Sequence, residues 1–240
     1  MVLSPELRRI RWSAATRIVA SRHPPIDLYE RVSPDPAVWE ALIAAEMLTN
    51  PRVRDELGEI RLVAAEERVS GPGAAYVMAP FTHRNPQGGR FSGAGHGAYY
   101  AAHDLPTAIA ETSYHFGRFA TDSEDGPRYE DMRVLVGRID ALLHDLATLD
   151  ADEQRRLLDP DDYTASQAFA VTLRAAGSAG VQYPSVRRRG GRCVAMFRPS
   201  AVGIPVQTKH LQFHWDGARV RRYFDYEEGR WVPTEPPPAG

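Results

Sequence analysis

The chain has 240 residues, a formal net charge of −2 and a pI near 6.5. A chain of this length makes one domain or two small ones and buries a sizeable core without covalent cross-links. The near-neutral charge excludes a protein that coats nucleic acid through bulk positive charge, and the single cysteine, Cys193, excludes an intramolecular disulfide and a cysteine-based metal site.

The N-terminal residues carry charges where a signal peptide needs an apolar stretch. No segment approaches the roughly 20 apolar residues of a membrane span. We therefore expect a soluble, cytoplasmic protein that does not contact membranes.

The first predicted elements are a short strand over residues 28–32 and a buried helix after it. Asp35 and Pro36 supply the N-cap and the first-turn proline of this helix. Residues 60–64 and 75–78 are predicted as further strands.

In the middle of the chain, a stretch rich in Gly, Asn and Pro over residues 80–97 resists regular assignment. A strand is predicted over residues 98–102, then a helix over 105–116 with a proline in its first turn. Glu111 belongs to this helix. Residues 132–139 alternate like a strand.

A capping box formed by Thr164 and Gln167 predicts another helix, which Gly177 ends. Strands over 181–183 and 193–197 then flank an arginine-rich turn.

The last third is mostly strand. Residues 211–215 and 220–224 flank an Asp216-Gly217 pair, which predicts a hairpin with a type I′ turn. The pattern as a whole predicts one α+β domain over residues 1–232, with C-terminal β-hairpins. A proline-rich tail over residues 233–240 is predicted to be disordered.

Several enzyme classes lack their motifs in this sequence. There is no Gly-x-Gly-x-x-Gly and no Walker-type loop, so we exclude hydride transfer and nucleotide-driven phosphoryl transfer. The eight histidines lack the paired spacing of zinc sites, so no metal is predicted.

Two short segments carry the chemistry that remains. Gly88-Gly89-Arg90 is either a plain turn with a solvated arginine or a cation held near flexible backbone. Glu111 is either the polar face of an amphipathic helix or a functional acid, and Tyr100 alone would be a core residue.

The second segment is Tyr183-Pro184-Ser185, in which the proline favours extended backbone at the preceding residue, so Ser185 emerges at a strand end. The arginines that follow form either a solvated loop or a site for phosphates, because planar guanidinium groups bind phosphate oxygens two at a time. They are Arg187, Arg188, Arg189 and Arg192.

Taken in order, these motifs resemble those of the RES-domain family, the toxins of RES–Xre type II toxin–antitoxin systems. The matching segments are Leu28-Tyr29-Glu30-Arg31-Val32, Gly88-Gly89-Arg90-Phe91, Tyr100-Ala101-Ala102, Ala108-Ile109-Ala110-Glu111, Gly180-Val181-Gln182-Tyr183-Pro184-Ser185 and Gly190-Gly191. They span roughly residues 28 to 200.

The resemblance implies an ADP-ribosyltransferase-like fold of mixed and antiparallel sheets flanked by helices. It also implies an enzyme that consumes NAD+ as a substrate and has no prosthetic group. By this carry-over Glu111 is the essential acid, Arg31 and Arg90 are the functional arginines, Tyr100 is the pocket aromatic and Ser185 is the hydroxyl. Gly89 joins the arginines, Tyr100 and Ser185 in binding NAD+.

Cleavage of the nicotinamide–ribose bond develops oxocarbenium character, which a carboxylate such as Glu111 can stabilise. The acceptor stays open at this stage. Water or phosphate would give NAD+ hydrolysis or phosphorolysis, and a protein side chain would give an ADP-ribosyltransferase that modifies a cellular target.

The resemblance further implies an Xre-like helix-turn-helix antitoxin as partner, and a homodimer or larger toxin–antitoxin complex. A non-enzymatic alternative is that the arginine turn binds nucleic acid or an acidic partner. The basic cluster is small and has no interleaved aromatics for base stacking, so direct nucleic-acid binding is not expected.

Overall fold

The computed structural model describes residues 5–22, 38, 41–42, 59–83, 85, 88–93 and 95–234. Its strands form a single eight-stranded sheet. The order of its strands is β1-β2-β5-β4-β3-β6-β7-β8, and β3 and β4 are the parallel pair in an otherwise antiparallel sheet. The strands are β1 (Leu7–Ala20), β2 (Tyr99–Ala102), β3 (Arg128–Asp145), β4 (Gly180–Pro184), β5 (Arg192–Met196), β6 (Val206–Trp215), β7 (Val220–Asp225) and β8 (Arg230–Pro233).

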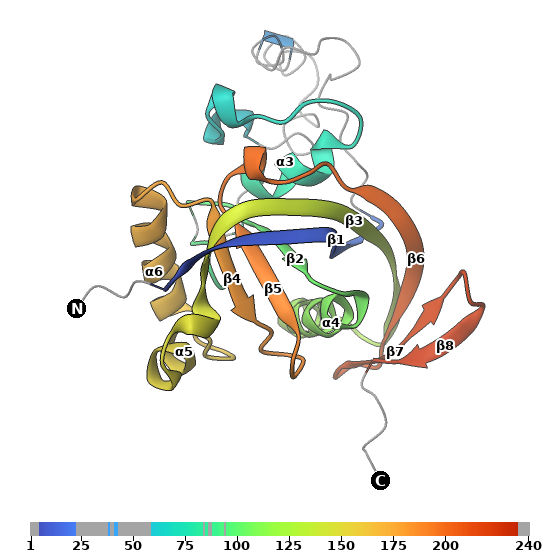
Figure 1. Cartoon of the computed structure of the whole chain (residues 1–240). Helices are drawn as coiled ribbons and strands as arrows, with labels where there is room; N and C mark the ends of the chain where they lie inside the picture. Colours follow the sequence, from blue (N-terminus) through green and yellow to red (C-terminus); the bar gives the residue numbers. More distant parts are fainter. Residues whose placement is uncertain are drawn as a thin grey trace.

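Strands β1 to β5 form a closed ring, because β1 pairs with β3 as well as with β2. The pairing with β3 extends along most of β1. β3 is long enough to pair with three strands: with β1, with β6 and, at its last residues, with β4. The β6–β7–β8 meander extends from this body (Figure 1).

Helices cover both faces of the sheet (Figure 1). They are α3 (Ala74–Thr82), α4 (Leu105–Asp122), α5 (Ala151–Leu157) and α6 (Thr164–Ala175). Short 3-10 turns lie at Ile60–Leu62, Ala65–Glu67, Leu146–Thr148 and Pro199–Ala201. α4 begins where Asp104 accepts a hydrogen bond from the Thr107 backbone N–H, with a proline in the first turn.

Two apolar clusters form the core, one on each face. The α4 side contains Phe116, Phe213 and Trp215, whose rings meet edge to face, and the α3 side contains Met78 and Phe81. Buried aromatic pairs of this kind add to the free energy gained by burial. α4 is thereby fixed against the sheet.

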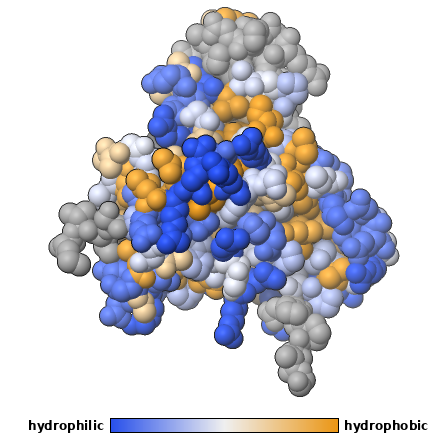
Figure 2. Space-filling model, in the orientation of Figure 1, coloured by the Kyte–Doolittle hydropathy of each residue, from blue (hydrophilic) through white to orange (hydrophobic). Residues whose placement is uncertain are grey.

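The surface is mixed in character. Figure 2 shows hydrophilic residues over much of one face, with apolar residues in separate areas. Exposed large apolar side chains belong to different elements, for example Leu7, Leu142, Val171 and Val206. No helix in the described ranges is long and apolar enough to cross a membrane.

The α+β class and the C-terminal hairpins are confirmed, with several corrections in detail. Residues 60–64 and 75–78 were predicted as strands, but residues 60–62 form a 3-10 turn and residues 75–78 lie in α3, because apolar runs this short do not distinguish helix from strand. The predicted strand over 28–32 lies outside the described residues, and so does most of the helix predicted after it.

The predicted capping box is wrong. Tyr163 occupies the N-cap position of α6, and Asp162 accepts the backbone hydrogen bond of Thr164. Gln167 instead donates to the carbonyl of Gly89, 3.1 Å away, and so ties α6 to the Gly-rich segment.

The predicted type I′ turn is also wrong. Trp215 pairs with Val220, so four residues form the loop, and Asp216 accepts from the N–H groups of Ala218 and Arg219. A type I′ turn needs positive φ at both central residues, and of Asp216 and Gly217 only the glycine has it.

The prediction of a disordered tail from residue 233 is wrong for its first two residues. Pro233 belongs to β8, and Thr234 donates from its hydroxyl to the carbonyl of Val220. Residues 235–240 lie outside the described residues. The domain boundary at residue 232 stays a prediction.

Candidate active site

A tight turn presents Arg90. The backbones of Gly89 and Ser92 exchange two hydrogen bonds of 2.7 and 3.2 Å, and Arg90 and Phe91 lie between them. The Tyr100 hydroxyl accepts from the Phe91 N–H at 2.9 Å and lies 3.1 Å from the Ser92 hydroxyl. A Cβ at Gly89 would come within 2.8 Å of the Tyr100 oxygen, so a glycine is required there.

The Arg90 side chain is buried, at 6% exposure. Its Nη1 donates to the backbone carbonyl of Asp159, and its guanidinium lies 4.5 Å from the centroid of the Tyr163 ring. Both partners belong to the segment just before α6. Its direct contacts are therefore with neutral groups, and the Asp159 carboxylate interacts with its charge from a greater distance.

Glu111 and Ser185 meet at the centre of the site. The Ser185 hydroxyl donates to Glu111 Oε1 at 2.6 Å and accepts from the backbone N–H groups of Arg187 and Arg188 at 3.2 and 3.0 Å. Ser185 lies 74 residues from Glu111 in sequence, at the end of β4, and the carboxylate projects from the second turn of α4. The charge-assisted bond fixes both side chains.

Two arginines after Ser185 line the same region. The Arg187 guanidinium lies 3.2 Å from the centroid of the Tyr114 ring and donates to the carbonyl of Pro160. Arg188 donates to the Thr107 hydroxyl at 3.2 Å. The β4–β5 turn and the start of α4 are thereby connected.

Electrostatic coupling shows which groups share the site. The pKa of His115 is lowered, mainly because packed protein atoms desolvate its ring. Glu111 opposes this shift, and Arg187, Arg90 and Arg118 add to it. A carboxylate and three guanidinium groups therefore act on one imidazole. Asp161 lies 4.0 Å from the Arg187 guanidinium and offsets part of this positive charge.

Cys193 does not supply a nucleophile here. Its thiol is 3.8 Å from Glu111 Oε1, and burial together with the Glu111 charge raises its pKa far above the usual value. The thiol stays protonated at neutral pH. No cluster of three His, Cys, Asp or Glu residues that could hold a metal occurs within the described ranges.

The residues predicted from the sequence are distributed as follows. Glu111 and Ser185 are in direct contact, Arg90 and Gly89 lie on the adjoining turn, and Tyr100 contacts that turn from β2. Arg31 lies outside the described residues.

Two of the four arginines in the arginine-rich turn lie apart. The guanidinium of Arg192 lies over the Trp12 ring at 5.9 Å, on the opposite face of the sheet, and Arg189 is exposed.

Other polar residues of the site were missed. Tyr114, His115 and Arg118 follow Glu111 at helical spacings of three, four and seven residues, so they lie on the same side of α4. That spacing was visible in the sequence. Tyr163, which contacts both Arg90 and Arg118, had no sequence signal because it comes from a loop.

Comparison with known proteins now gives the family. The profile of the RES domain matches residues 65–216, and the chain therefore belongs to the RES-domain family. The predicted membership is confirmed. A curated relative, the uncharacterized protein y4oC of Sinorhizobium fredii (strain NBRC 101917 / NGR234), is 28% identical over 218 residues, or 88% of this chain and 87% of the relative.

Among solved structures, a chain in the crystal structure of the M. tuberculosis MbcT–MbcA toxin–antitoxin complex is similar, with a TM-score of 0.38 and 18% identity. The similarity covers 51% of this chain and 73% of that chain.

Proposed function

We propose that this protein is the toxin of a toxin–antitoxin pair and that it cleaves the nicotinamide–ribose bond of NAD+. The observation that carries the proposal is the 2.6 Å contact between Ser185 and Glu111, with Arg90, Arg118 and Arg187 in electrostatic range of the same helix face. The Glu111 carboxylate suits a group that is cationic at the nicotinamide ring, and the guanidinium groups suit an anionic diphosphate, although Asp159 and Asp161 offset part of their charge.

In the proposed reaction the glycosidic bond breaks and its electron pair goes to the nicotinamide nitrogen, which neutralises the pyridinium charge. The ribose carbon becomes oxocarbenium-like, and the Glu111 carboxylate stabilises that charge. An acceptor oxygen then bonds to the same carbon and loses its proton to solvent.

The residues around Glu111 have separate proposed roles. Arg90 binds the diphosphate, since its direct aromatic and carbonyl contacts orient the guanidinium and form no ion pair with it. Tyr100 and Gly89 act as positioning residues, because the tyrosine hydroxyl holds the turn and the glycine makes room for it. Ser185 fixes the rotamer of Glu111 and so holds the carboxylate ready before substrate binds.

The antitoxin is proposed to be an Xre-like helix-turn-helix protein that covers this site. Support comes from membership of the RES-domain family, which matches more than half of the chain. Self-association of the toxin is part of the same proposal.

Product analysis with NAD+ radiolabelled in the adenylate moiety tests the reaction type. Purified protein is incubated with labelled NAD+, with and without phosphate and with cell lysate. Free ADP-ribose supports hydrolysis, a phosphorylated product supports phosphorolysis, and label retained on a protein band supports ADP-ribosyl transfer. Unchanged NAD+ under all three conditions would refute the proposed activity.

A further inference from the structure

A cavity of about 330 Å³ lies away from the candidate active site. The 3-10 turns at Ile60–Leu62 and Ala65–Glu67, the end of α3, the C-terminal end of α6 and the segment after β5 enclose it. Its lining contains neither Glu111 nor Ser185 nor Arg90. Its volume is at the lower end of the range of small-molecule sites.

Arg174 supplies a cation to this cavity. Its guanidinium donates to the backbone carbonyls of Gly97 at 2.8 Å, Phe197 at 3.2 Å and Phe91 at 3.5 Å, and it lies 4.1 Å from the centroid of the Phe197 ring. These three acceptors are backbone carbonyls and therefore neutral. Burial lowers the pKa of Arg174 to about 10, so the group stays protonated at neutral pH.

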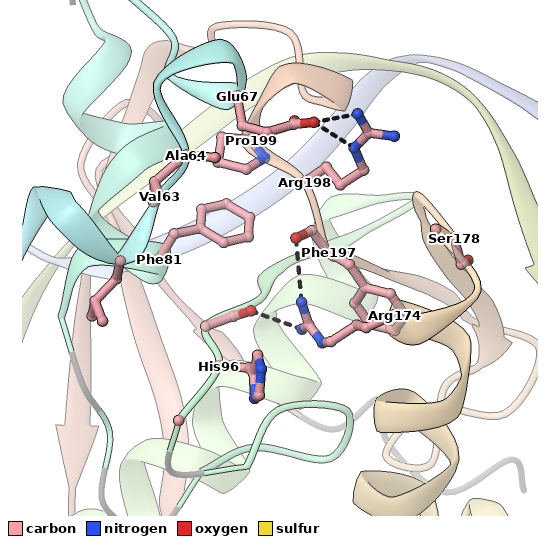
Figure 3. Close-up of a pocket in the computed structure, with 14 residues that line it drawn as sticks. Val63, Ala64, Glu67, Phe81, His96, Arg174, Ser178, Phe197, Arg198 and Pro199 are labelled. Atoms are coloured by element: carbon pink, nitrogen blue, oxygen red, sulfur yellow. Dashed lines mark hydrogen bonds and ion pairs between the residues drawn. The ribbon is translucent and has the colours of Figure 1, made fainter. Parts of the chain in front are cut away.

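The other charges around the cavity cancel. Glu67 accepts from Arg198 Nε at 2.8 Å and also from the Ser200 hydroxyl. This ion pair lies at one end, and Arg174 and His96 lie at the other, with the Phe81 ring between them (Figure 3). Arg174 therefore supplies the positive charge of this cavity that no carboxylate of its lining pairs with.

Apolar groups line the space between the two ends. Phe81 and Val63 are buried, at 6% and 5% exposure, and Pro199 and Phe197 complete the wall. A charged group at one end and an apolar wall beside it suit a ligand with one anionic head and a short apolar body.

We propose that this cavity binds a small organic anion, whose carboxylate or phosphate group is held by Arg174 and whose apolar part packs on Phe81. The assignment is independent of NAD+ cleavage. It places the ligand behind the turn that presents Arg90, because Arg174 also contacts the Phe91 carbonyl of that turn.

Amide NMR titration locates the ligand directly. Benzoate and phenylphosphonate serve as probes for the two head groups, and benzamide is the neutral control. We expect saturable shifts of the Gly97, Ser178 and Phe197 amides with at least one anion. We expect binding at least about 5-fold weaker with benzamide, since the lost charge interaction is worth about 1 kcal/mol or more.

Matched variants separate the cavity from other anion sites. R174Q should weaken the anionic probe at least about 10-fold, whereas R192Q, which removes an arginine on the sheet face against Trp12, should leave it unchanged. A64W serves as a second variant if R174Q does not fold, because Ala64 is an exposed residue of the cavity rim and an indole there should block entry.

Three results would overturn the proposal. The first is the absence of saturable shifts at these amides with both anions. The second is equal binding of benzamide. The third is binding that survives A64W and R174Q but moves to the amides of Gly191 and Arg188, which would assign the anion to the candidate active site instead.

Discussion

At the residue scale, the site depends on positions where the backbone packs so closely on side chains that even a Cβ atom would clash. Gly89 is the clearest case, because an added methyl group would lie 2.8 Å from the Tyr100 hydroxyl and 2.9 Å from the Ser92 hydroxyl. The turn that presents Arg90 would have to shift. The candidate site is thus held by backbone geometry as well as by charged side chains.

Gly89→Ala should therefore reduce the free energy of unfolding by about 1–3 kcal/mol, because the Tyr100–Phe91 hydrogen bond is lost in a buried setting. Gly93→Ala is the matched control, since nothing lies within 4 Å of a Cβ there, and we expect a change within about 0.5 kcal/mol. Urea denaturation measures both. Equal effects of the two variants would refute the steric explanation.

Ser185→Ala removes one donor to Glu111 and one acceptor of two backbone N–H groups. We expect the rate of nicotinamide release to fall roughly 10- to 100-fold, since hydrogen bonds to charged groups contribute about 1.5–3 kcal/mol. Ser123→Ala, at the exposed C-terminal end of α4, is the control and should keep the full rate. An unchanged rate in the Ser185 variant would remove this residue from the proposed site.

The residues of the site were partly predictable. Glu111, Ser185, Arg90 and Tyr100 were found through ordered motifs that resemble a known family, and not through local pattern alone. His115 and Arg118 follow from helical spacing once Glu111 is chosen. The contact of Tyr163 with Arg90 could not be predicted, because it depends on how the loop before α6 folds back.

At the element scale, the loop between β6 and β7 depends on one carboxylate. Asp216 accepts from the N–H groups of Arg219 and Ala218 and pairs with Arg221. These hydrogen bonds hold the pKa of Asp216 far below its usual range. A single side chain thus replaces the two-residue turn that the sequence suggested.

Asp216→Ala should lower the urea midpoint at pH 7 because the loop loses its internal acceptor. A depressed folded-state pKa means that this contribution is fully present above the unfolded value of about 3.9 and is lost as pH falls below it. The difference from the wild type should therefore be constant between pH 7 and 5 and shrink below about pH 4. A difference that grew on acidification would contradict this explanation.

The strands and helices differ in how well they could be predicted. α4 and the strands after residue 180 were recognised because caps, turns and alternation agree. β1 was missed. The alternation of Ile10 and Trp12 with exposed arginines is a local signal, but it covers only part of the strand, whose full length depends on its pairing with β3. The missed α5 has an Asp150 cap but only seven residues.

At the scale of the whole molecule, closure of the first five strands brings β4 and α4 together, and with them Ser185 and Glu111. That closure joins segments more than 100 residues apart, for example β1 and β3. No pattern within one element could specify it.

If NAD+ binds at this site, it should stabilise the whole fold. In E111Q, which should bind without turnover, NAD+ at 100 times its dissociation constant should raise the free energy of unfolding by about 2.7 kcal/mol. Thermal denaturation with and without NAD+ measures the effect. The same measurement with NADP+ tests whether an added phosphate changes binding. A melting temperature that does not respond to saturating NAD+ would contradict binding.

The central claim is tested most directly by nicotinamide release from NAD+ by the purified protein and its E111Q variant. The glutamine keeps an oxygen for the Ser185 hydroxyl but removes the charge, so the fold should persist while the rate falls at least about 100-fold, since a charge that stabilises a transition state contributes about 2.7–4 kcal/mol. Asp122→Asn, at the exposed end of the same helix, should keep the wild-type rate. A folded E111Q protein that releases nicotinamide as fast as the wild type would contradict the account.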